Sequence, residues 1–135
     1  MNLVLTADLL TSQIARLVQP FDLTPASGLV LSMLADSKEP LPPNEIATRL
    51  IITRATVTGL VDSLERRGYV KRRSHPSDRR MTLVEITKKG IRVANAFRPV
   101  VHEHQREWFQ ILSEQELQRL IGALHRLQVA LAEID

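Results

Sequence analysis

The sequence predicts a mainly α-helical fold with one small β-hairpin, and three observations support this prediction. Apolar residues recur at helical spacing along most of the 135 residues, and hydroxyl residues or prolines stand where helices would begin. Between residues 69 and 86 the pattern changes to two short runs typical of β-strands, separated by a turn. Helical spacing then resumes and continues to the end of the chain.

Three helices are expected in the first fifty residues. Residues 3–18 have apolar side chains at helical spacing. Thr24 can cap a second helix, and Pro25 is tolerated in its first turn, so we expect this helix to run to about Ser37. A proline-rich connection leads to a short third helix over residues 43–50. Its expected buried stripe is Ile46, Ala47 and Leu50.

A tight turn at residues 51–53 is expected to join the third helix to a fourth, with Thr53 as the cap. The apolar face of this fourth helix is Val57, Leu60, Val61 and Leu64. Gly68 suits the position just past its C-terminus. The hairpin is expected to pair residues 69–73 with residues 81–86.

The C-terminal part is expected to hold two helices. The first runs from Thr87 to about Leu112 and is bent by Pro99, and the second opens with a capping box of Ser113 and Glu116. Its apolar stripe is Leu117, Leu120, Ile121, Leu124, Leu127, Val129, Leu131 and Ile134. This stripe is wider than one neighbour in a domain of this size requires. Both ends of the chain are therefore candidate dimer surfaces.

The composition, 44% hydrophobic and 24% charged residues, is ordinary for a soluble globular domain, and it excludes several classes of protein. With no cysteine, the chain cannot hold a disulfide, a thiolate zinc site, an iron–sulfur cluster or a cysteine nucleophile. No apolar run approaches the ~18–20 residues that span a bilayer, and the N-terminus lacks the features of a signal peptide. We therefore expect a cytoplasmic protein with no membrane partner.

Neither a cofactor nor an enzymatic activity is expected. The chain has no phosphate-binding glycine loop, no serine elbow and no convincing pair of carboxylates or histidines. His102 and His104 are two residues apart on a helix, so their side chains diverge and cannot share one metal ion. Trp108 and Phe109 are more typical of a core or an interface than of a ligand cage.

The positive charge of the chain is concentrated in one segment. The net charge is +3, but residues 65–92 hold ten basic and three acidic residues, which leaves a net charge of −4 on the rest. Such a cluster is either a solvated charge run or a surface for a polyanion. The order of elements favours DNA. A helix that follows a tight turn fits the major groove, and a basic hairpin can place an arginine in the minor groove.

Candidate DNA-binding residues lie on the fourth helix and on the hairpin. They are Thr53, Arg54, Thr56, Thr58, Arg66, Arg73, Arg79 and Arg80. Several alternatives stay open at this point. Arg54 can bind a guanine or a phosphate, and Thr56 can equally turn back and cap the helix. Asp62 is better suited to an internal ion pair than to DNA.

Two basic runs leave further alternatives. Arg66 and Arg67 can favour the helix dipole or contact phosphate. Lys71, Arg72 and Arg73 alternate along a strand and so cannot all face DNA. Lys88 and Lys89 at the start of a helix oppose the dipole preference, which weakly favours a phosphate contact.

Residues 41–90 resemble the DNA-binding core of MarR-type transcriptional regulators. The matching segments are NEIATRL at 44–50, TRATVTGLVDSLERRGYV at 53–70 and DRRMTLVEITKKG at 78–90. The resemblance implies a winged helix-turn-helix lobe over residues 24–90 and helical dimerisation regions over 1–20 and 91–135. It matches residues 53–62 to the recognition helix and Arg80 to a wing-tip arginine that enters the minor groove, with Asp78 as the acid that orients it. The sequence departs from the family pattern at Ile51, Pro42 and the short first helix.

What the resemblance implies about function is specific. Such regulators are homodimers that bind a pseudo-palindromic operator in double-stranded DNA, usually as repressors relieved by a small-molecule effector or a redox signal. The lack of cysteine excludes sensing by cysteine oxidation. We therefore predict a ligand-responsive homodimeric repressor, although no residue identifies the ligand. The alternative is a winged-helix protein-interaction module whose basic face docks an acidic partner.

Overall fold

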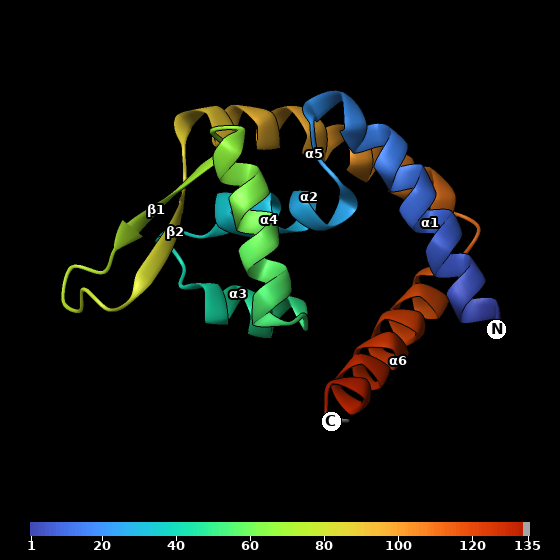
Figure 1. Ribbon diagram of the computed structural model, residues 1–135. Coiled ribbons are helices and arrows are strands. Elements are labelled where there is room, and N and C mark those ends of the chain that lie inside the picture. Colours follow the sequence, from blue (N-terminus) through green and yellow to red (C-terminus); the bar gives the residue numbers. More distant parts are fainter. Residues whose placement is uncertain (134–135) are drawn as a thin grey trace. The chain divides into compact units, whose positions relative to one another are not determined.

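The computed structural model describes residues 1–133 and confirms a mainly α-helical chain with one β-hairpin (Figure 1). The elements are α1 (Asn2–Val18), the 3-10 helix η1 (Gln19–Phe21), α2 (Pro25–Asp36), α3 (Pro43–Leu50), α4 (Arg54–Arg66), β1 (Val70–Ser74), β2 (Thr82–Ile86), α5 (Lys88–Phe109) and α6 (Glu114–Ala132). The chain divides into two compact units, residues 1–101 and 102–135, which are described separately.

Side-chain caps set the start of α2, α4 and α6, as the sequence predicts. At α2 the Thr24 hydroxyl accepts a hydrogen bond from the Ser27 N–H at 3.2 Å, and the Ser27 hydroxyl accepts one from the Thr24 N–H at 2.8 Å. At α6, Ser113 and Glu116 form the same reciprocal pair. Each cap satisfies backbone donors that would otherwise lack a partner.

The turn before α4 forms without glycine. Ile51 adopts a left-handed conformation with φ of 55°, and the Ile52 N–H donates to the carbonyl of Ala47 at 3.1 Å. A left-handed backbone costs an L-residue roughly 1–2 kcal/mol. Pro42 precedes α3 and provides no side-chain cap. Both departures from the expected pattern therefore leave the helix-turn-helix geometry intact.

The hairpin contacts the rest of the first unit through Tyr69, just before β1, and through Val84 in β2. β1 and β2 pair in antiparallel register from Val70 opposite Ile86 to Ser74 opposite Thr82. The predicted strands began one residue earlier in each case. Tyr69 instead lies buried just before β1, where its hydroxyl donates to the carbonyl of Phe21 at 2.7 Å. The Met81 N–H donates to the carbonyl of Asp78 at 3.0 Å within the turn. Leu41 forms an isolated bridge to Val84 on the outer side of β2.

The core of the first unit lies where α2, α3, α4 and α5 meet the hairpin. Its fully buried side chains are Val18, Val30, Leu31, Ile46, Val57, Val61, Leu64, Val70 and Val84. The predicted stripes agree, with Leu50 and Leu60 only partly buried. Gly90 allows α5 to lie close to the hairpin, since a Cβ there would stand 2.1 Å from the carbonyl oxygen of Tyr69.

The second unit consists of the end of α5 and α6. In α6 the apolar residues Leu120, Ile121, Leu127, Val129 and Leu131 are between 37% and 57% exposed. Ile134, the last member of the predicted stripe, lies outside the described residues. Pro99 lies inside α5, which ends at Phe109 rather than near Leu112. None of the helices in residues 1–133 is long and apolar enough to cross a membrane.

Candidate nucleic-acid interface

The first turn of α4 combines a local cap with one free cation. The Thr53 hydroxyl accepts from the Thr56 N–H at 3.1 Å and lies 2.7 Å from the Thr56 hydroxyl. The Thr58 hydroxyl donates to the carbonyl of Arg54 at 3.1 Å. Thr56 therefore turns back into the cap, which was one of the two alternatives for it. Arg54 is exposed, and its side chain makes no hydrogen bond or ion pair with residues 1–133, so its guanidinium is available to a partner.

Arg72 connects the hairpin to α4. Its guanidinium contacts Asp62 at 2.6 Å and Glu65 at 2.8 Å, and its backbone N–H donates to the other Glu65 oxygen at 3.2 Å. The Arg72 side chain is only 28% exposed, so part of this network is shielded from water. Asp62 was expected to have an internal partner; the structure identifies Arg72 as that partner.

Lys71 and Arg73 lie on the opposite side of β1 from Arg72. Both pair with Glu85, each at 3.6 Å, and both remain largely exposed. The alternation predicted for these three cations is therefore observed, and it separates them by role. Arg72 positions the hairpin against α4, whereas Arg73 and Lys71 lie at the outer surface with only weak pairing.

The turn of the hairpin presents Arg80 to solvent. One carboxylate oxygen of Asp78 accepts from the Arg80 backbone N–H at 3.0 Å and from its Nε at 3.3 Å. The Arg80 side chain is nevertheless 92% exposed. Asp78 therefore holds the backbone N–H and Nε of Arg80 and leaves the two terminal guanidinium nitrogens exposed. This arrangement suits an arginine that enters a narrow groove. Arg79 is also exposed, with no ion pair to the described residues.

The cations at and after the C-terminal end of α4 divide into those bound within the lobe, Arg67 and Lys89, and Arg66, whose side chain makes no ion pair with the described residues. Arg67 donates to the Ser63 hydroxyl at 2.8 Å and to its carbonyl at 3.2 Å. Lys89 lies over the ring of Tyr69, 5.5 Å from its centre, where burial and then the charge of Asp22 raise the pKa of the tyrosine. Arg66 is exposed, about 18 Å along the helix axis from Arg54 at 1.5 Å per residue.

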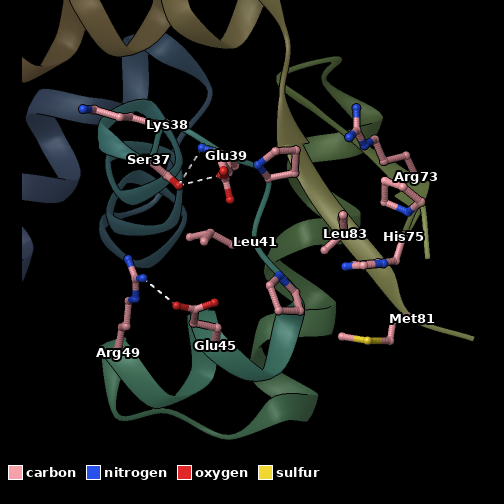
Figure 2. Close-up of a pocket in the computed structure, with 13 residues that line it drawn as sticks. Ser37, Lys38, Glu39, Leu41, Glu45, Arg49, Arg73, His75, Met81 and Leu83 are labelled. Carbon is pink, nitrogen blue, oxygen red and sulfur yellow. Dashed lines mark hydrogen bonds and ion pairs between the residues drawn. The ribbon is translucent and has the colours of Figure 1, made fainter. Parts of the chain in front are cut away.

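A hollow of about 790 Å³ lies beside the hairpin, between the α2–α3 connection, α3 and the two strands (Figure 2). Leu41 and Leu83 line it together with Arg73. Glu45 and Arg49, one turn apart on α3, also line it and form an ion pair at 2.5 Å. The mixed apolar and charged lining comes from segments far apart in sequence, which is why sequence patterns did not reveal it. No group of three metal-ligating side chains occurs in the described part of the chain.

Taken together, a helix-turn-helix (α3–α4) followed directly by a basic hairpin defines a winged helix-turn-helix lobe. The MarR family model matches residues 21–81, which include α2, α3, α4 and the first strand of the hairpin. The chain belongs to the MarR family, and the resemblance seen in the sequence is confirmed.

Three similar proteins place the chain within this family. It is 31% identical over 105 residues to the transcriptional regulator MhqR of Bacillus subtilis, a match that covers 78% of this chain and 72% of MhqR. It is 45% identical over 62 residues to the transcriptional repressor YetL of Bacillus subtilis, covering 45% of this chain and only 37% of YetL. The fold is similar to that of MepR in the S. aureus MepR–DNA complex, with a TM-score of 0.86 at 25% identity over 95% and 94% of the two chains.

Proposed function

We propose that this protein is a cytoplasmic, sequence-specific DNA-binding repressor that acts as a homodimer on a pseudo-palindromic operator and responds to a small molecule. The observation that carries the proposal is the pair of arginines, Arg54 and Arg80, whose side chains the lobe leaves exposed. Arg54 lies in the first turn of α4, and Arg80 extends from the hairpin turn. A helix N-terminus suits the major groove, and an exposed hairpin arginine suits the minor groove. The DNA complex of MepR supports the same partner.

The site residues take distinct roles in this proposal. Arg54 reads a base edge or binds a phosphate, and Thr53 and Thr56 hold the start of α4 rigid. Thr58 and Arg66 lie farther along the exposed surface of the helix. On the hairpin, Arg73, Arg79 and Arg80 contact the DNA backbone and minor groove, with Asp78 orienting Arg80.

The rest of the chain supplies the dimer in this proposal. Residues 24–90 form the DNA-binding lobe, and residues 1–20 and 91–135 form the dimerisation regions. The exposed apolar side chains of α1 and α6 support this division, because side chains such as Leu9 and Leu131 are 68% and 57% exposed. The ligand response is supported by the family and by the hollow beside the hairpin, where a bound molecule would touch both α3 and the wing.

The test is DNA binding by wild type and Arg80→Ala across a salt series, with the duplex that the wild type selects from a random pool. Removing one phosphate-neutralising cation should flatten the slope of log affinity against log salt by about one unit. Lys38→Ala is the charge-matched control, since Lys38 is exposed outside the proposed interface and should leave the slope unchanged. If the random pool yields no preferred duplex at moderate salt, the repressor proposal fails. The interaction with an acidic protein partner then takes precedence.

A further inference from the structure

We infer that Gly59 is the point on α4 at which the base pairs in the major groove come closest to the helix backbone. This inference rests on the proposed function. It also specifies which part of α4 lies deepest in the major groove. Gly59 lies in the second turn of α4 and is exposed. Apart from its two chain neighbours and the backbone of the adjacent helical turns, a Cβ placed there would have no described atom within 4 Å.

Glycine at this position is unfavourable for the lobe by itself. Inside a helix, glycine lowers the folding equilibrium constant about fivefold relative to alanine. Two other glycines of the lobe have a structural reason. Gly68 has φ of +77°, and at Gly90 a Cβ would clash with the Tyr69 carbonyl. Gly59 has neither a positive φ nor a neighbour that a Cβ would meet. The space above it is therefore open to a partner outside the described chain.

The surroundings of Gly59 suit a polyanion that approaches closely. Ala55 and Asp62 share its face of the helix, at four residues before and three after. Ala55 adds only a methyl group. Asp62 would repel phosphate, but its carboxylate is bound by Arg72 at 2.6 Å. The exposed face around Gly59 thus has small side chains at residues 55 and 59, and the charge of Asp62 on this face is neutralised by Arg72.

The two free arginines of α4 lie on either side of Gly59 along the helix. Arg54 and Arg66 are about 18 Å apart along the axis, whereas the major groove is about 12 Å wide. If the axis of α4 lies across the groove, side chains at both ends of the helix can therefore reach phosphates on its two walls. The stretch between them, which contains Gly59, then faces the base edges. A methyl group at residue 59 would push the helix away from them.

The test is the variant Gly59→Ala, measured with the duplex that the wild type selects from a random DNA pool. We expect the melting temperature to rise by roughly 2–4 °C, because alanine is the better helix former. We expect DNA affinity to fall at least about fivefold, because an added methyl in a close-packed contact is unfavourable. The salt slope should not change, since no charge is altered. A rise in stability with a loss of binding is the specific signature.

Gly28→Ala is the matched control. It adds the same methyl group to a helix of the same lobe, where the new Cβ would lie 3.7 Å from the Phe97 ring, an ordinary contact. It should leave DNA affinity unchanged. The inference is overturned if Gly59→Ala binds the duplex as tightly as wild type. It is also overturned if Gly59→Ala lowers the melting temperature, since the fold itself would then need the glycine. If the wild type selects no duplex at all, the proposed function fails and this inference fails with it.

Discussion

The contact between Arg72 and α4 allows a quantitative test of how strongly the β1–β2 hairpin is bound to α4. Arg72 bonds both Asp62 and Glu65, and the side chains of these two acids are 48% and 43% exposed. Fully exposed ion pairs contribute 0.2–1 kcal/mol each, whereas breaking a buried pair costs about 3–5 kcal/mol. This partly shielded pair of contacts lies between those limits. We therefore expect Arg72→Met, which keeps most of the apolar stem, to lower the free energy of unfolding by about 1–2 kcal/mol.

The loss of DNA affinity should exceed what the loss of stability explains. Without Arg72, the carboxylates of Asp62 and Glu65 are no longer neutralised, and both lie on α4, the helix that we propose enters the major groove. Because like charges repel even in partly screened surroundings, we expect affinity for the selected duplex to fall about tenfold at low salt. High salt should reduce the difference between variant and wild type.

Urea unfolding followed by circular dichroism measures the stability part of this prediction. Arg73→Met is the matched control for stability alone, because its only ion pair within residues 1–133 is a 3.6 Å contact with Glu85 at an exposed position. It should cost less than about 0.5 kcal/mol. A double-mutant cycle with Asp62→Asn then isolates the Arg72–Asp62 pair. If the two single effects add within about 0.3 kcal/mol, the pair contributes nothing and the reasoning is refuted.

Two further predictions concern the scaffold. Gly68→Ala should lower the free energy of unfolding by about 1 kcal/mol, because φ is +77° and the new Cβ meets only a flexible lysine chain. Gly90→Ala should cost more, since its Cβ would collide with backbone, and equal urea midpoints for the two variants would contradict this order. Hydrogen bonds from the Ser113 backbone and hydroxyl lower the pKa of Glu116. Stability from this carboxylate is present above its ordinary pKa and lost as the pH falls through the lowered value. Ser113→Ala removes the hydroxyl and keeps the backbone N–H, so it should raise this pKa partway toward its ordinary value in a carboxyl NMR titration. An unchanged titration curve would exclude the hydroxyl as one of its causes.

Local signals explain why so much of the fold was predictable from the sequence. A cap such as Thr24 with Ser27, or a stripe such as Val57, Val61 and Leu64, depends on residues three or four apart. The partners of Arg72 do not, because they are set by how β1 crosses α4 after the chain has turned at Gly68. The sequence therefore indicated that three consecutive cations must point in different directions. It did not indicate which of them would be used within the lobe.

The positively charged segment, residues 65–92, contains both cations that are paired with acids of the segment and cations without an acidic partner in the described chain. Its three acids are all paired with cations of the segment itself: Glu65 with Arg72, Asp78 with Arg80, and Glu85 with Lys71 and Arg73. The net charge of residues 65–92 is thus carried by side chains that have no acidic partner in the described chain, such as Arg66, Arg79 and Lys88. These side chains lie at the end of α4, at the hairpin turn and at the start of α5. Arg54, which lies outside this segment, adds a fourth position at the start of α4. A partner that contacts several of these positions must itself be extended and repeat its negative charge along its length, as the backbone of double-stranded DNA does.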